Sequence, residues 1–340
     1  MTNNINRSLH FDVLRIIAMI LVMLFHYTTQ FSKNVQATSF PFMFTSKSSG
    51  FAVALFLFMV GFFSYNSLVS SKTFISYLKK RFFRLYPTFL LCLSITTLVL
   101  KFSGTNNISI KHYLLNAVLI NRFVNVPFVD GAYWYLLIVV LFTLIISVCK
   151  ILNVKLRICL YAIYTIIFII LGLLNRFIYS IPEILSFAFF EYINKCFLGL
   201  FIAYLYFEWS DLNMCFKSFF VSIIVLLSLG EFLWIGTIKS LFEIIALIVF
   251  VIFVLLGNKL SFNSTLQGII HSVSSESYFV YLIHQQVGFV FLKFILNIGI
   301  NCTLALLFTF IFIIILSTCH FFAVRLFNYY IKHNYSKSSV

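Results

Sequence analysis

Two ionisable residues, Arg15 and His26, lie in an apolar stretch that reads FDVLRIIAMILVMLFHY at residues 11–27. An ionisable side chain in a membrane span costs roughly 2.5–3.5 kcal/mol on insertion scales, so it usually marks a pathway or a site. In an α-helix, eleven residues make about three turns, which predicts that both side chains share one face, about 16 Å apart along the axis. Asp12 is predicted to pair with Arg15, because it precedes that residue by one helical turn.

A second basic group stands in the segment KKRFFRLYP, residues 79–87. Arg81 and Arg84 are three residues apart, on one side of a helix, and Pro87 is expected to disturb the start of the following span. Paired guanidinium groups suit a multiply charged phosphate ligand. Each of these basic residues taken alone is also typical of an interfacial anchor or a topology signal, and His26 alone is typical of a hydrogen-bonded packing residue.

The composition places these residues in a membrane protein. The chain has 340 residues, of which 62% are hydrophobic and 10% charged, with a mean hydropathy of +1.04. Soluble domains carry about a quarter charged residues, and β-barrel strands would alternate in polarity. The sequence therefore predicts an all-α polytopic membrane protein in contact with the lipid bilayer. The net charge of +15 is distributed between apolar segments, so we expect no nucleic-acid partner.

The whole chain, residues 1–340, is interpreted as a single integral-membrane domain with ten spans. These are expected at about residues 11–30, 51–69, 85–102, 132–151, 156–174, 187–207, 216–235, 241–257, 278–296 and 301–327. A cytoplasmic N-terminus leaves about twice as many Lys and Arg residues inside as outside, which favours a multi-pass protein of the plasma or inner membrane with both termini cytoplasmic. The cysteines lie in or beside apolar runs without metal-binding spacing, so free thiols and no metal site are expected.

Several motifs together resemble the acyltransferase-3 family of integral-membrane O-acyltransferases. They are Arg15 and His26 in the first span, Arg81-x-x-Arg84 before the third, GAYWYL at residues 131–136 and SYFVYLIHQ at residues 277–285. The resemblance covers essentially the whole chain. The sequence departs from the family pattern after His284, where Gln285 and Gln286 stand and members often have a nearby proline.

The resemblance implies an enzyme that moves an acyl group, most often acetyl, from cytoplasmic acyl-CoA to a hydroxyl of an extracytoplasmic glycan such as an exopolysaccharide, or of a lipid-linked sugar. Acyl-CoA would be a donor substrate, with no cofactor bound. Arg15, Arg81 and Arg84 would bind its phosphates. His26 would be catalytic, either as a general base or as the residue that accepts the acyl group; both alternatives remain open.

Other residues are expected to support the donor-binding arginines and the catalytic histidine. Asp12 would position Arg15, whereas Trp134 and Tyr135 would stack on a sugar ring or form part of the interfacial aromatic belt. Tyr281 and His284 would support the site from the late span. Glu191 is expected to pair with Lys195, four residues later. Glu243, near the outer end of its span, is expected to be solvated, and a role in binding substrate is the alternative.

Two other functions fit the same composition. The main alternative is a transporter or flippase for a polysaccharide or lipid-linked precursor, which often shows Gly- or Pro-broken spans in two matching halves. No such symmetry is visible in this sequence, which has four prolines. The other is a structural partner of polysaccharide-synthesis proteins, which the ionisable residues on one face of the first span disfavour. Such proteins are also potential partners of an enzyme.

Overall fold

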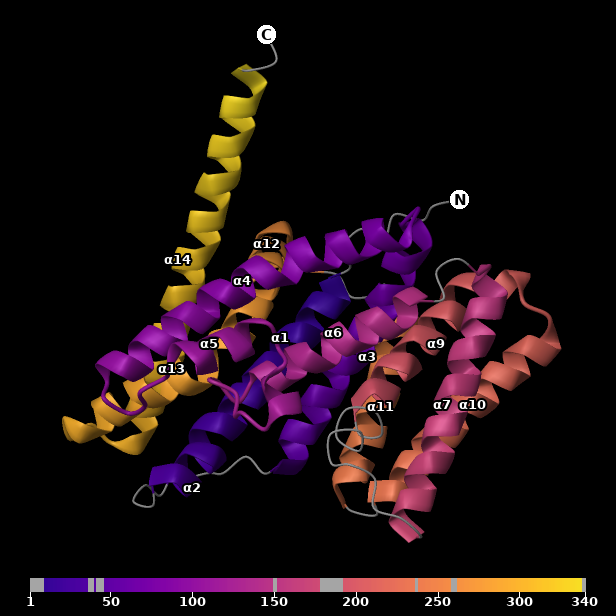
Figure 1. The fold of residues 1–340 in the computed structure, drawn as a ribbon, viewed down its shortest axis with the longest axis horizontal. Coiled ribbons are helices and arrows are strands. Elements are labelled where there is room, and N and C mark those ends of the chain that lie inside the picture. Colours follow the sequence, from indigo (N-terminus) through magenta and orange to yellow (C-terminus); the bar gives the residue numbers. More distant parts are fainter. Residues whose placement is uncertain are drawn as a thin grey trace.

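The computed structural model describes residues 9–35, 40, 46–148, 152–177, 192–235, 238–257 and 262–337. In these residues the chain is helical and contains no β-strand, so the predicted all-α class is confirmed (Figure 1). The principal helices are α1 (Leu9–Phe25), α2 (Phe31–Val35), α3 (Ser46–Ser70), α4 (Phe74–Phe102), α5 (Ile110–Ala117), α6 (Tyr133–Val148), α7 (Val154–Phe177), α9 (Asn194–Glu208), α10 (Met214–Ile235), α11 (Ile238–Leu256), α12 (Ser264–Ser275), α13 (Ser277–Asn297) and α14 (Cys302–Lys337).

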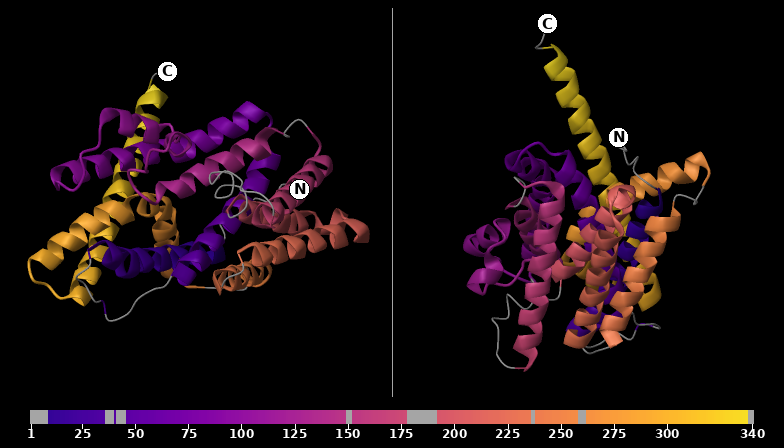
Figure 2. Two further views of the ribbon diagram at one scale, coloured as in Figure 1. Left: turned by 60° about the horizontal axis from the view of Figure 1, so that its bottom comes forward. Right: turned by 90° about the vertical axis from the view of Figure 1, so that its right-hand side faces the viewer.

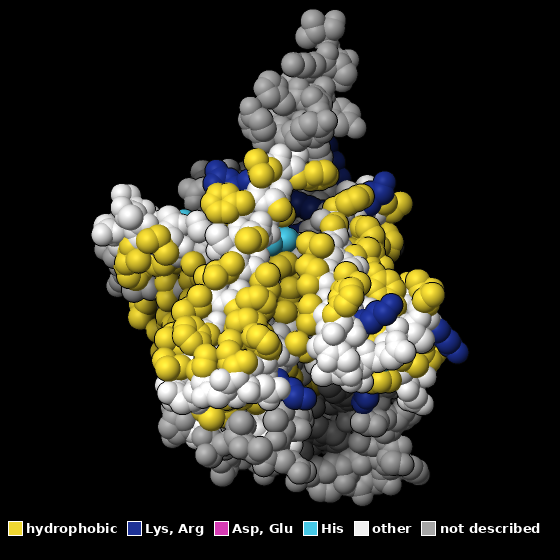
Figure 3. All heavy atoms as spheres, turned by 90° about the vertical axis from the view of Figure 1, so that its left-hand side faces the viewer, with side chains coloured by type: hydrophobic (Ala, Val, Ile, Leu, Met, Phe, Trp, Pro, Cys, Tyr) yellow, Lys and Arg dark blue, Asp and Glu magenta, His cyan; other side chains and the backbone are white. Residues whose placement is uncertain are grey.

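Five helical segments of the described chain are long and apolar enough to cross a membrane. They are Leu9–Lys33, Ser49–Ser70, Phe74–Phe102, Ser277–Asn297 and Cys302–Phe327. Shorter apolar helices cover Tyr133–Val148, Leu156–Ile167, Met214–Gly230 and Ser240–Leu256. Figure 3 shows hydrophobic side chains covering the middle of one face, with Lys and Arg side chains mostly above and below them. The chain is therefore a polytopic helical membrane protein, while the number and limits of its spans stay a prediction.

Helix α3 lies at the centre of the bundle, packed against α1, α9 and α11 (Figures 1 and 2). Its contact with α9 is a backbone-to-backbone seam. A Cβ atom added at Gly61 would lie 1.8 Å from the carbonyl oxygen of Cys196, and one added at Gly199 would lie 2.0 Å from that of Phe58. Small residues allow this approach, which membrane helices use because lipid provides no hydrophobic drive for their association.

The first transmembrane helix changes its winding at His26. Helix α1 ends at Phe25, and residues His26–Gln30 form a π-helical turn that leads into α2. Within this turn, the hydroxyl of Thr28 donates a hydrogen bond to the carbonyl oxygen of Leu24 at 2.6 Å. Single π-turns are frequent at functional sites, because they redirect side chains within a continuous helix.

Helix α4 extends beyond the expected span at its start. It begins after Thr73, whose side chain and that of Ser76 form a reciprocal capping box, and it continues through Pro87 to Phe102. Arg81 and Arg84 are therefore inside a regular helix, which fixes them on one side as their spacing predicts.

Lys195 forms an ion pair with a second helix within the described residues. Its ammonium group lies 3.3 Å from the carboxylate of Glu243 on α11, and both side chains are buried. The expected solvation of Glu243 was therefore wrong. The expected partner Glu191 lies outside the described residues. A buried charge requires a partner, and only tertiary packing reveals which carboxylate supplies it.

Candidate functional site

The two predicted basic motifs meet at one cavity of about 620 Å³. Arg15 reaches it from the start of α1, and Arg81 and Arg84 reach it from the first half of α4. The remaining polar wall comes from the α12–α13 junction and from His320 on α14. We call this space the arginine cavity.

Arg15 is held by a buried carboxylate. Its Nη1 donates to Oδ1 of Asp12 at 2.9 Å, which confirms the pairing predicted from their spacing, and Asp12 is fully buried. The same carboxylate accepts a hydrogen bond from Ser274 at 2.6 Å and contacts Nδ1 of His271. Asp12 therefore ties α12 to α1 as well as positioning Arg15. The sequence did not indicate Ser274 or His271, because their helix lies between the apolar runs.

Arg81 is also fixed against the wall of the arginine cavity. Its Nη2 donates to the hydroxyl of Ser64 at 2.8 Å, and its guanidinium carbon lies 5.5 Å from the centre of the Tyr77 ring. Nε of Arg81 is buried without a hydrogen-bond partner among the described residues. The guanidinium group thus keeps an unused donor near a cavity that also receives Arg84 and Arg15, an arrangement suited to a polyanion.

A second cavity, of about 470 Å³, lies at the other end of α1. We call it the histidine cavity because His26 lines it, together with Val22, Phe25, Gln30, Lys33, Ser49, Val53, Gly131, Trp134, Tyr281 and Gln285. It contains no carboxylate in its wall among the described residues. The cavity is therefore polar without being strongly charged.

His26 faces His284 across helices. Their ring centres are 5.0 Å apart at an interplanar angle of 68°. Nδ1 of His284 is 2.8 Å from the carbonyl oxygen of Tyr281, and a carbonyl can only accept, so this nitrogen carries the proton and Nε2 keeps a lone pair. Nε2 of His284 and Nδ1 of His26 are both buried without a hydrogen-bond partner among the described residues. An imidazole nitrogen that keeps its lone pair can accept the proton of a hydroxyl group placed beside it.

Helix α13 is fixed beside His284 by two long-range hydrogen bonds. The hydroxyl of Tyr27 donates to the carbonyl of His284 at 2.8 Å. The carboxylate of Asp130 accepts from the backbone N–H of Gln286 at 2.9 Å and from that of Ala132 at 2.8 Å. Burial raises the pKa of Asp130 to about 7, although both N–H groups favour its charged form.

Sequence reasoning missed Tyr27 and Asp130. Asp130 stands directly before an apolar run, which is a helix-start signal, but its bond to α13 joins segments far apart in the chain. Tyr27 adjoins His26 and reads as one more aromatic residue of the span. Neither long-range contact follows from a local pattern.

The predicted aromatic residues divide between the two cavities. Trp134 lines the histidine cavity, whereas its neighbour Tyr135 lines the arginine cavity. Tyr281 lines both. The structure therefore brings Arg15, Arg81 and Arg84 together at one end, His26 and His284 together at the other, and an aromatic layer between them.

Comparison with known proteins gives one match. A family model described as an acyltransferase domain, Acyl_transf_3, matches residues 9–324. No curated protein and no solved structure matches the sequence significantly. The matched range includes all of the residues that line the two cavities.

Proposed function

The chain belongs to the acyltransferase-3 family, and from that premise we propose that it is a membrane O-acetyltransferase acting on a surface glycan. The donor would be acetyl-CoA from the cytoplasm, and the acceptor a hydroxyl of an exopolysaccharide or a lipid-linked sugar of the cell envelope. The family membership establishes a membrane acyltransferase; the donor, the acceptor and the orientation are our proposal.

The observation that carries the proposal is the pair of cavities at opposite ends of α1. One is lined by the three guanidinium groups of Arg15, Arg81 and Arg84 and the other by the imidazole of His26, and they share Tyr281 as a wall. An acyl-CoA has matching halves, since its nucleotide end carries several negative charges and its pantetheine arm is nearly neutral. The arm would need to cover about 16 Å from Arg15 to His26, the rise of eleven helical residues.

In this proposal the arginine cavity binds the phosphates of the donor. Guanidinium groups bind phosphate oxygens through paired, charge-assisted hydrogen bonds. Arg15 and Arg81 are held in place before the ligand arrives, by Asp12 and Ser64, so less side-chain freedom is lost on binding. The positive-inside bias of the sequence favours a cytoplasmic position for this end, where acyl-CoA is available.

The histidine cavity would carry out the transfer. The acceptor hydroxyl attacks the thioester carbonyl carbon, His26 takes the hydroxyl proton, and the C–S bond breaks as the ester C–O bond forms. The proton then passes from His26 to the leaving thiolate, which gives free CoA. General-base catalysis of this kind contributes typically 10²–10⁴-fold. Acylation of His26 itself, followed by transfer to the hydroxyl, uses the same atoms in two steps.

The wall of the histidine cavity also offers contacts for a sugar. Trp134 presents an aromatic ring, and Oε1 of Gln285 is a buried acceptor without a partner among the described residues. A Cβ atom at Gly131 would lie 2.7 Å from Nε2 of Gln285, so glycine leaves room for this amide. Hydroxyl groups could therefore be read by hydrogen bonds while a sugar face stacks on Trp134.

The test is transfer of radioactive acetyl from acetyl-CoA to glycan in membranes that contain the protein. We expect an ester-linked label that mild alkali removes, and no label in membranes without the protein. A transporter or flippase would instead be indicated by glycan that fails to reach the surface, with its acyl content unchanged. Absence of acyl transfer from any acyl-CoA, in the presence of folded protein and glycan, would reject the proposal.

A further inference from the structure

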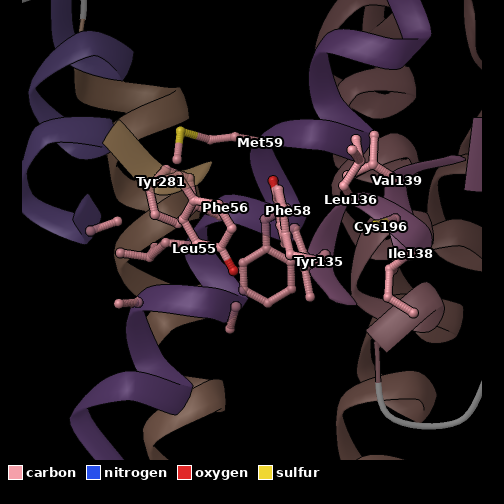
Figure 4. Packing of buried hydrophobic residues seen from close by; sticks show 14 of the residues in the cluster. Leu55, Phe56, Phe58, Met59, Tyr135, Leu136, Ile138, Val139, Cys196 and Tyr281 are labelled. Atoms are coloured by element: carbon pink, nitrogen blue, oxygen red, sulfur yellow. The ribbon is translucent and has the colours of Figure 1, made fainter. Parts of the chain in front are cut away.

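Three aromatic side chains form a continuous layer between the two cavities. Phe56 of α3, Tyr135 of α6 and Tyr281 of α13 have ring centres 4.9–6.2 Å apart in each pairing. Each residue is less than a tenth exposed. Figure 4 shows them packed side by side, with Leu55 and Met59 nearby. We call these three residues the aromatic partition.

The aromatic partition lies at the boundary between the arginine cavity and the histidine cavity. Phe56 and Tyr135 line the arginine cavity alone, while Tyr281 has one cavity on each side of it. The direct line from Arg15, Arg81 and Arg84 to His26 passes this layer of rings. The backbone of α3 behind Phe56 is held against α9 at Gly61 and Gly199.

Resting on the proposed function, we propose that Phe56, Tyr135 and Tyr281 form a selectivity gate that sets the length of the acyl group reaching His26. The three rings come from separate helices, so rotation of their side chains can change the opening between them. A two-carbon acyl group adds little width and length beyond the pantetheine arm. A longer chain needs additional space in a layer that is already closely packed.

The same layer would protect the thioester. With the gate closed, water in the histidine cavity has no open path toward the donor. If water replaces the sugar hydroxyl, His26 takes a proton from water, a C–O bond forms and the C–S bond breaks, giving a carboxylic acid and free CoA. A widened partition should therefore raise this hydrolysis in the absence of acceptor.

The first test measures donor preference. The ratio of kcat/KM for butyryl-CoA to that for acetyl-CoA is compared in the wild type, Phe56→Ala and Tyr135→Leu. We expect the ratio to rise about tenfold or more in both variants, since each methylene excluded or admitted by an apolar pocket is worth at least that factor. The control is Phe142→Leu, which removes a fully buried ring of α6 that lines neither cavity. An unchanged ratio in both partition variants would overturn the gate.

The second test needs no catalysis, so it separates the gate from the proposed function. Val53→Cys places a thiol in the histidine cavity, and Ser275→Cys places one in the arginine cavity, in a chain without its native cysteines. A membrane-impermeant thiol reagent is given only to the side from which Ser275→Cys reacts. We expect Val53→Cys to react at least tenfold faster when combined with Phe56→Ala, and no faster when combined with Phe142→Leu. Equal rates in all backgrounds would reject the partition as a barrier.

Discussion

The arginine cavity and the histidine cavity use polar groups in opposite ways. In the arginine cavity, the charged groups already have protein partners, such as Asp12 for Arg15 and Ser64 for Arg81. At the histidine cavity, Nδ1 of His26 and Nε2 of the adjacent His284 are buried without partners among the described residues. A binding site gains from cations that are held in place, whereas a proton-transfer site needs an unused lone pair. The contrast supports our proposal of donor binding at one end and chemistry at the other.

The positions of the charged side chains agree with the free-energy cost of placing a charge in the membrane interior. A charged side chain is tolerated where it pairs or reaches water, and neutral imidazole is far less costly than guanidinium at depth. The three arginines accordingly line one cavity, whereas the proposed acceptor end depends on His26 and His284, with Lys33 in its wall. Donor binding at the arginine cavity and proton transfer at the histidine cavity can be tested separately by substitution, in order of decreasing expected effect.

Replacing His26 should remove the chemistry and spare donor binding. We expect His26→Ala and His26→Gln to lower kcat at least about 100-fold, because neither side chain can accept the hydroxyl proton. Donor affinity, measured by equilibrium binding of acyl-CoA, should be unchanged. If His26→Gln keeps wild-type kcat, His26 only packs or donates a hydrogen bond, and the contrast between the cavities fails.

Replacing Arg84 should weaken donor binding and spare the chemical step. We expect Arg84→Ala to raise KM for acetyl-CoA about tenfold, the value of one charge-assisted hydrogen bond, with kcat within a few-fold of the wild type. Lys111→Ala, on the exposed surface of α5, is the matched loss of a cation and should change neither constant.

A donor without phosphates sharpens this test. With acetyl-pantetheine, wild type and Arg84→Ala should perform alike, because the contact that was removed has no ligand. A difference of tenfold with the truncated donor would mean that Arg84 supports the structure and does not bind phosphate.

Removing the hydroxyl of Tyr27 should affect the histidine cavity moderately. Tyr27→Phe loses the hydrogen bond to the carbonyl of His284, worth about 1 kcal/mol, and we expect kcat to fall a few-fold as His284 shifts. Tyr65→Phe loses a comparable bond to Glu208, away from both cavities, so it should lower stability without lowering kcat. Equal kcat losses in both variants would show a general stability effect.

Asp130 should make stability depend weakly on pH. Its pKa of about 7 in the folded protein lies above its unfolded value, so the folded state holds the proton more tightly. Its contribution to stability is present below about pH 4 and is lost as the pH rises through about 7. We expect the unfolding midpoint in detergent to fall by several degrees over that window, and Asp130→Asn to flatten the fall. Asp211→Asn, at an exposed position, should leave the slope intact; a slope unchanged in Asp130→Asn would contradict the assignment.

Local spacing predicted the contacts that lie within one helix. The pairing of Asp12 with Arg15 follows from one helical turn, and the shared side of Arg81 and Arg84 from the same rule. Composition predicted the helical membrane class, because lipid imposes long apolar segments. The catalytic and binding roles of these residues stay predictions.

Contacts between helices could not be predicted in the same way. The sequence predicted that Glu243 would be solvated, but the structure pairs it with Lys195 on another helix. The bonds of Tyr27 to His284 and of Asp130 to Gln286 likewise join distant segments. The π-turn at His26 also lies beyond a rule that assumes regular winding. Such features depend on which helices become neighbours, and one sequence contains no direct record of that.

The glycine seam between α3 and α9 has a consequence for how the protein is made. Helix α3 leaves the ribosome early, whereas α9 follows only after α4, α6 and α7 have been synthesised. Until then the bare backbone around Gly61 faces lipid or a temporary neighbour, and the seam at Cys196 and Gly199 cannot close. The centre of the bundle is therefore completed late in biogenesis, and a chain interrupted before α9 leaves its central helix unmatched.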